Sequence, residues 1–126
     1  MSHSLDLALL RRANVARQAA YRNAKGETVD CSQWSLEDWF CSTLGELGEA
    51  SNIAKKLNRV RDGILGNKES EPELRAALAD EIADTFIYLD LLAQSQGISL
   101  EAAVVDKFNR TSAKIGYENT LFNRSA

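Results

Sequence analysis

The sequence predicts an all-α protein, a bundle of four to five helices that we expect oligomerisation to complete. Apolar residues recur at intervals of three and four along four stretches, and residues that cap or stop helices lie between these stretches. The chain of 126 residues has the length of one domain, and a chain of this length can bury a real core. We therefore interpret residues 1–126 as a single domain.

The first helix is expected from Leu5 to Ala24. Leucine and alanine lie along it at helical spacing, at Leu5, Ala8, Leu9, Ala13, Ala16, Ala20 and Ala24. Its arginines are spread over the other faces, which is typical of a solvated surface. Lys25 and Gly26 are expected to end this helix, and a polar connection follows over 27–33.

The second helix is expected to begin at Ser35, whose hydroxyl can cap the first turn while Asp38 completes a capping-box arrangement. A stripe of apolar and small residues predicts its buried side, at Leu36, Phe40, Leu44, Leu47, Ser51, Ala54 and Leu57. Gly45 and Gly48 are unusual inside a helix, because each glycine costs roughly 1 kcal/mol relative to alanine. We expect a close backbone approach at these glycines to compensate.

Glycines and an asparagine between residues 61 and 71 favour a loop after the second helix. The third helix is expected from about Pro72, with Ser70 or Glu71 as its cap. Its predicted buried stripe is Leu74, Leu78, Ile82, Phe86, Leu89 and Ala93.

A fourth helix follows, because Gly97 is suited to end the third helix and Ser99 to cap the next one. Its predicted buried residues are Leu100, Val104, Phe108, Thr111 and Ile115. Gly116 is expected to stop it. In the polar tail that follows, Leu121 and Phe122 either pack on a partner subunit or hang free.

The composition limits which partners the protein can bind and in which cellular compartment it is expected. The formal net charge is −3 and the pI is about 5.2, which argues against a protein that binds nucleic-acid polymers. Cys31 and Cys41 form no CxxC motif and have almost no histidine to join them, which is typical of reduced thiols. No signal-peptide pattern and no membrane-spanning apolar run is evident. We expect a soluble cytoplasmic protein without membrane association.

Two acidic pairs lie beside the predicted buried stripes. Glu46 and Glu49 are three residues apart in the second helix, and Glu81 and Asp84 are three apart in the third. On a helix this spacing places both side chains on one face, with about 5 to 6 Å between their Cβ atoms. Four carboxylates gathered at a helix interface repel one another unless cations neutralise them. Mg²⁺, with Mn²⁺ as the alternative, prefers oxygen ligands, so the pairs predict a divalent metal site.

Two other classes of protein compete with a metal-dependent enzyme. A ferritin-like di-iron bundle needs Glu-x-x-His pairs, and the only histidine, His3, lies outside every helical pattern, which nearly excludes this class. A non-catalytic helical interaction module would show the same apolar stripes, with its acidic residues exposed and idle. This second class stays open.

Several motifs together resemble one family. They are Trp34-Ser35-Leu36-Glu37-Asp38-Trp39, Gly45-Glu46-Leu47-Gly48-Glu49-Ala50 with Lys55-Lys56-Leu57, Leu78-Ala79-Asp80-Glu81-Ile82-Ala83-Asp84 with Ile87-Tyr88-Leu89-Asp90-Leu91-Leu92-Ala93, and Lys107-Phe108-Asn109. Over about residues 34–114 the chain resembles the MazG-like nucleoside triphosphate pyrophosphohydrolases of the all-α pyrophosphatase superfamily. The resemblance implies a MazG-like bundle with its core in 34–114, assembled as a homodimer or homotetramer. It also implies Mg²⁺-dependent hydrolysis of nucleoside triphosphates to monophosphate and pyrophosphate, in house-cleaning or nucleotide-pool control.

The resemblance assigns the metal ligands, and the chemistry of the remaining side chains suggests candidates for the other roles. The metal ligands and catalytic residues would be Glu46, Glu49, Glu81 and Asp84, and Glu49 is the candidate that orients or deprotonates the attacking water. The candidate contacts to the substrate are Lys56, Lys107, Asn109 and Lys114 for the triphosphate, Trp34 or Trp39 for the base, and Tyr88 beside the acidic pair. Ordinary core packing is the alternative for both tryptophans.

Two features depart from the family pattern. Many members carry an acidic residue immediately before the first ligand, and this chain has Gly45 there, so any support from that acid must come from elsewhere, with Asp80 as one candidate. The separation between Glu49 and Glu81 is long because of the loop at 61–71. That loop either shapes the nucleotide site or lies at a subunit interface.

Overall fold

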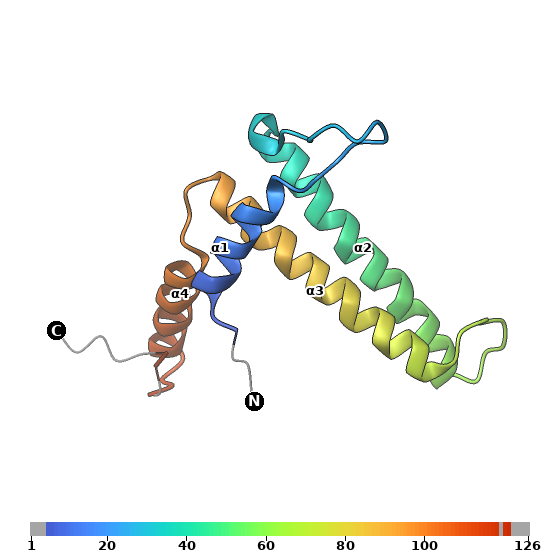
Figure 1. Ribbon diagram of the computed structural model, residues 1–126. Helices are drawn as coiled ribbons and strands as arrows, with labels where there is room; N and C mark the ends of the chain where they lie inside the picture. The colour runs from blue at the N-terminus through green and yellow to red at the C-terminus, as the bar shows by residue number, and fades with distance from the viewer. Residues whose placement is uncertain (1–4, 119, 122–126) are drawn as a thin grey trace.

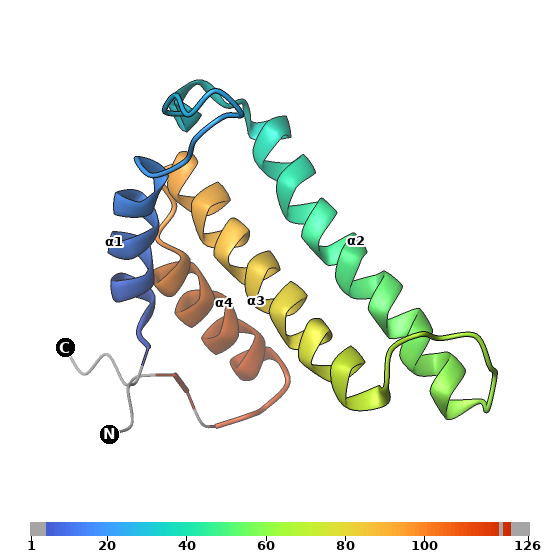
Figure 2. The same cartoon turned by 45° about the vertical axis from the view of Figure 1, so that its right-hand side comes forward.

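The computed structural model describes residues 5–118, 120 and 121, and over these residues it shows four α-helices and no strand. The helices are α1 (Leu7–Gln18), α2 (Leu36–Arg61), α3 (Glu71–Ser95) and α4 (Leu100–Lys114), and a short 3-10 helix, η1, spans Cys31–Gln33. The long helices α2 and α3 form an antiparallel hairpin, and α1 and α4 lie beside α3 (Figures 1 and 2). The expected all-α bundle is confirmed. Among the described helices, none combines the length and apolarity that a membrane span requires.

The predicted caps at the starts of α2, α3 and α4, and the predicted ends of α3 and α4, are also confirmed. Ser35 caps α2 and Ser70 caps α3, each within a complete capping box, and Ser99 caps α4. A Ser or Thr cap is worth about 1 kcal/mol because it satisfies backbone N–H groups that have no partner inside the helix. Gly97 and Gly116 follow α3 and α4 with positive φ, a conformation that glycine adopts without strain.

The first helix is shorter than predicted, since it ends at Gln18 and not at Ala24. Tyr21 then turns the chain, and its carbonyl accepts a hydrogen bond from the backbone N–H of Val29. The Asn23 side chain accepts hydrogen bonds from the N–H groups of Lys25 and Glu27, which offers the backbone an alternative to helix. Alanines at helical spacing could not outweigh this turn, because they bury little apolar area.

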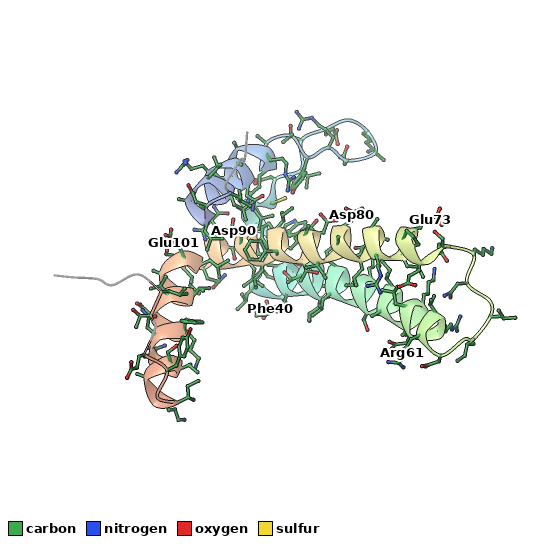
Figure 3. The ribbon with its side chains drawn as sticks, turned by 90° about the horizontal axis from the view of Figure 1, so that it is seen from below. Phe40, Arg61, Glu73, Asp80, Asp90 and Glu101 are labelled. Atoms are coloured by element: carbon green, nitrogen blue, oxygen red, sulfur yellow. The ribbon has the colours of Figure 1, made fainter. Side chains whose placement is uncertain are left out.

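The prediction of which helix face is buried was wrong for much of α2. In the single chain Leu36, Phe40, Leu44 and Leu47 are exposed, while the buried residues of α2 are Trp39, Thr43 and Ala50. At 100° per residue these buried positions form an adjacent line on the helix, and that line faces α3. The predicted stripe therefore lies on one flank of the contact, and Phe40 is on the opposite side of the hairpin from Asp80 (Figure 3).

The same correction applies to the other two stripes. On α3, Leu74 and Ala93 are buried as predicted, but the middle of the stripe is exposed, at Ile82, Phe86 and Leu89. On α4 the buried residues are Val105 and Ser112, and the exposed members of the predicted stripe are Val104, Phe108, Thr111 and Ile115. Over the described part of the chain, these large apolar side chains are left exposed.

The main buried cluster lies at the end of the hairpin where α2 begins and α3 ends. Cys31, Trp39, Leu91 and Leu92 form it, and the partly buried residues packed against it are Tyr21, Val29, Trp34, Ile87 and Tyr88. Cys31 and Cys41 are both free thiols, the first buried and the second exposed. The loop over 62–70 closes the opposite end of the hairpin (Figure 1).

Leu121, in the segment after α4, is hydrogen-bonded back to α4. The side-chain amide of Asn109 donates to the Leu121 carbonyl at 3.0 Å and accepts from the Leu121 N–H at 2.8 Å. Leu121 is therefore tied to α4 and does not hang free. Phe122 lies outside the described residues.

Candidate functional site

The hairpin brings the two acidic pairs together. Glu46 of α2 and both Glu81 and Asp84 of α3 each offer a carboxylate oxygen, and the three oxygens lie within 4.8 Å of one another. Glu46 and Glu81 are half-buried, and Asp84 is exposed. The pairs meet because α2 and α3 pack side by side in antiparallel orientation, with both acidic lines on the same flank of the contact.

Glu49 lies beside this group without belonging to the set of three oxygens. Its charge and its hydrogen bonding both act on the carboxyl groups of Glu46 and Glu81. The four predicted ligands thus divide into three residues that converge on one point and a fourth, exposed neighbour. We call Glu46, Glu49, Glu81 and Asp84 the carboxylate cluster.

The surroundings of Glu46 and Glu81 disfavour the charged forms of these two carboxyl groups. Burial raises the pKa of Glu46, and the charges of Glu49 and Asp84 raise it further. Burial also raises the pKa of Glu81, again with Glu49 as the strongest neighbouring charge. Both shifts follow from like charges crowded into a partly desolvated place.

No basic side chain offsets this repulsion in the part of the chain that the structure describes. The ion pairs there are Arg11–Asp90, Lys56–Glu69, Arg61–Asp62 and Arg75–Glu71, and none includes a member of the carboxylate cluster. A divalent cation would remove the repulsion, and three converging carboxylate oxygens are a group that could hold Mg²⁺ or Mn²⁺.

The glycines beside Glu46 and the acidic residue before Glu81 do not behave as the sequence predicted. Gly45 and Gly48 are exposed, and a Cβ atom built on either would meet nothing within 4 Å beyond the local backbone of α2 itself. Among the described residues, no other element therefore comes close to the backbone at these glycines. Asp80, the candidate substitute for the acid missing at Gly45, is exposed on α3. It does not appear among the charges that shift the pKa of Glu46 or Glu81.

Tyr88 lies one helical turn after Asp84 on α3. Burial raises the pKa of its phenol, and smaller contributions come from the carboxylates of Glu46 and Asp84. Tyr88 also packs against the buried core around Cys31, so it lies between that core and the carboxylate cluster. The sequence placed it correctly beside the acidic pair.

Trp34 and Trp39 contact each other near the start of α2. Their ring centroids are 4.7 Å apart and the ring planes are inclined by 50°. Trp39 is buried, only 3% exposed, and belongs to the core, whereas Trp34 is half-buried at its edge. Of the two candidates for stacking on a base, Trp34 is the one with accessible surface.

The predicted triphosphate contacts are not brought to the carboxylate cluster. Lys56 forms an ion pair with Glu69 in the loop after α2, and its carbonyl accepts a hydrogen bond from Asn67. Lys107 and Lys114 are exposed on α4, which packs on α1 and α3. The amide of Asn109 is occupied by Leu121.

Sequence reasoning missed a buried polar network between α1 and α3. Asp90, 1% exposed, accepts hydrogen bonds from Arg11 Nε at 3.1 Å and from Asn14 Nδ2 at 2.9 Å. Arg11 also donates to the Ile98 carbonyl at 2.9 Å. An acid inside the apolar run of α3 was the available signal, because a buried carboxylate needs partners.

Comparisons of the chain with known protein families, with curated proteins and with solved structures found no match. The chemistry available to the chain must therefore be inferred from its own residues.

Proposed function

We propose that this chain is a Mg²⁺-dependent hydrolase that converts nucleoside triphosphates to nucleoside monophosphates and pyrophosphate. The observation that carries the proposal is the convergence of Glu46, Glu81 and Asp84 to within 4.8 Å with no basic partner among the described ion pairs. The MazG-like pattern of the motifs around these residues supports the same reaction. A role in nucleotide-pool control or house-cleaning follows from that reaction.

The chemistry of the donor set fits a hard divalent ion. Glu46, Glu81 and Asp84 would hold Mg²⁺, with Mn²⁺ as the alternative, because carboxylate oxygens are the ligands these ions prefer. When bound, such an ion offsets negative charge on phosphate oxygens and acidifies water.

Glu49 is suited to act on the attacking water. It is exposed, it lies beside Glu46 and Glu81, and it is outside the three-oxygen group. In the proposed reaction water attacks the α-phosphorus, the bond from this phosphorus to the bridging oxygen breaks, and pyrophosphate leaves. The proton of the water passes to the Glu49 carboxylate, which acts as the general base.

We further propose that two or four copies of the chain associate through their exposed apolar residues. The apolar surface, as we name it, comprises Phe40, Leu44 and Leu47 of α2 with Ile82, Phe86 and Leu89 of α3. These residues share the flank of the hairpin opposite the carboxylate cluster, and contiguous exposed apolar residues commonly mark protein interfaces.

The apolar surface also supports the rival function, a non-catalytic helical interaction module. In that case the carboxylate cluster would be idle, and neither metal nor nucleotide would bind. The two functions make opposite predictions for a single assay.

That assay is pyrophosphate release from a panel of ribo-, deoxyribo- and modified nucleoside triphosphates, with and without Mg²⁺. The proposed function predicts metal-dependent release that is lost in Glu81→Gln and in Asp84→Asn, while circular dichroism shows the helices intact. Glu37→Gln, an exposed acid at the start of α2, is the matched control that should retain turnover. Absence of release from every substrate would favour the interaction module, and turnover retained in both variants would mean that the ligands are misassigned.

A further inference from the structure

A cavity of about 190 Å³ lies where the end of α1, η1, the start of α2 and the end of α3 meet. The residues that line it are Gln18, Cys31, Ser32, Trp34, Trp39, Gln94 and Ser95. None of these side chains carries a formal charge at neutral pH, and burial together with the charge of Asp30 raises the pKa of the Cys31 thiol. Walls of indole rings, amides and hydroxyls suit a neutral heteroaromatic ring better than a phosphate or carboxylate group.

Two amides in the wall of the cavity face each other. Gln18 Nε2 donates to Gln94 Oε1 at 3.2 Å, which joins α1 to α3. This bond leaves one acceptor, Gln18 Oε1, and the NH2 group of Gln94 without a protein partner among the described residues, together with the second N–H of Gln18. If the oxygen and nitrogen of both amides are exchanged, one oxygen acceptor and one NH2 group still remain free. The pair therefore presents the complement of a nucleobase edge, where donors and acceptors are adjacent.

The cavity and the carboxylate cluster lie along the same two helices. Trp39 and Glu46 are about two turns apart on one face of α2, or roughly 10 Å along its axis. Gln94 follows Asp84 by nearly three turns of α3, or roughly 15 Å. Tyr88 packs against the buried cluster that contains Cys31 and Trp39, and it follows Asp84 by one turn of α3, so it lies between the two places. These separations are comparable with the reach of a nucleoside triphosphate from its base to its phosphates.

We propose that this cavity takes the base of the nucleotide whose phosphates meet the carboxylate cluster, and that the Gln18–Gln94 amide pair reads the polar edge of that base. Trp34 then contributes the accessible ring face beside the base. The inference rests on the proposed function for the position of the phosphates. Binding of the base, however, is measurable without turnover.

Tryptophan fluorescence reports on the cavity alone, because the chain contains only two tryptophans and both line it. The probes are cytidine, uridine, thymidine, adenosine and guanosine, with ribose 5-phosphate as the control that lacks a base. We expect saturable quenching by at least one nucleoside and none by ribose 5-phosphate. Absence of saturable quenching by all five nucleosides in the folded protein would overturn the inference.

The amide pair is tested with the double variant Gln18→Met and Gln94→Met, which removes both amides together and leaves neither without its partner. We expect about 10-fold weaker binding of the preferred nucleoside, the loss of one good pair of base-edge hydrogen bonds. Gln33→Met is the matched control, since Gln33 is exposed and does not line the cavity. Unchanged affinity and unchanged preference in the folded double variant would remove the amide pair from base recognition.

A conservative variant keeps the test decisive if the double variant fails to fold. Gln94→Glu preserves the acceptor for Gln18 Nε2 and replaces the free donor with an acceptor, so it should change the order of preference among the nucleosides. An unchanged order would again exclude the amide pair. Nucleoside quenching without pyrophosphate release would refute the proposed reaction and support the cavity as a base-binding site. Pyrophosphate release without nucleoside quenching would support the reaction and refute the cavity as a base-binding site.

Discussion

Glu46 of α2 and Asp84 of α3 bring carboxylate oxygens within 4.8 Å of each other, with Glu81 in the same group. Among the described residues no ion pair joins any of these acids to a basic side chain. Like charges at such separations destabilise the folded chain unless a cation joins them, and this has consequences that a melting experiment can measure.

Mg²⁺ or Mn²⁺ should raise the melting temperature. A ligand that binds only the folded state stabilises it by about 1.4 kcal/mol at ten times its Kd, or roughly 5 °C for a domain of this size. Glu46→Gln should abolish this rise and should leave the metal-free melting temperature unchanged or higher, because it removes one of the repelling charges. Glu37→Gln should keep the full metal response. A wild-type protein that is folded yet indifferent to millimolar metal would contradict the site.

The carboxylate cluster should also determine how the stability of the metal-free protein depends on pH. Burial and neighbouring charges raise the pKa values of Glu46 and Glu81 above the ordinary 4.5. The folded state therefore binds protons more tightly than the unfolded state at these two groups. At neutral pH, where both groups are ionised, they lower the free energy of unfolding. As pH falls through the raised pKa values, this lost free energy of unfolding is regained. The urea midpoint should thus rise on mild acidification, and less so in the double variant Glu46→Gln and Glu81→Gln.

At lower pH we expect the stability of the fold to decrease, and no longer to increase, as pH falls. Hydrogen bonds from Ser70 hold the pKa of Glu73 below its ordinary value, and those from Ser32 do the same for Asp30. The stability that these groups give is lost as pH falls through their lowered pKa values. A midpoint that fell steadily from neutral pH downwards would show that the cluster is not strained.

Local chemistry explains what the sequence predicted correctly. Ser35 and Ser70 cap helices because of residues three positions away, and the spacing of Glu46 and Glu49 places both on one face whatever surrounds the helix. The choice of the buried line on α2 was not local. Trp39 and Phe40 are neighbours in sequence, and only the approach of α3 decides that the first is buried and the second exposed.

Contacts between parts of the chain that are distant in sequence could not be predicted from a sequence pattern either. The bond between Gln18 and Gln94 depends on how α1 lies on α3, and two glutamines on polar helix faces give no sign of it. The ion pair between Lys56 and Glu69 likewise depends on the path of the loop. Asp90 differs from these, because a charge inside an apolar run is by itself a sign of a buried partner.

The buried pair of Arg11 and Asp90 should matter more than an exposed pair. Arg11→Met leaves a carboxylate that is 1% exposed with Asn14 as its remaining side-chain partner, and we expect a loss of about 1.5 to 3 kcal/mol in the free energy of unfolding. Arg75→Met breaks an exposed pair with Glu71 on the surface of α3 and should cost about 0.5 kcal/mol or less. Chemical denaturation of both variants checks the difference, and equal losses would argue that the network on Asp90 contributes nothing special.

Self-association through the apolar surface makes a prediction about solution size. Leu44 is 59% exposed and Phe86 is 40% exposed in the single chain, so a charge at either position costs a monomer little. In an interface the same charge would be buried without a partner, which costs several kcal/mol. Leu44→Asp and Phe86→Asp should therefore reduce a dimer or tetramer to monomers in analytical ultracentrifugation while the helices persist by circular dichroism. Leu65→Asp is the matched control, since Leu65 is 94% exposed in the loop at the far end of the hairpin and lies outside the apolar surface. A wild-type chain that sediments as a monomer at high micromolar concentration would refute association through this surface.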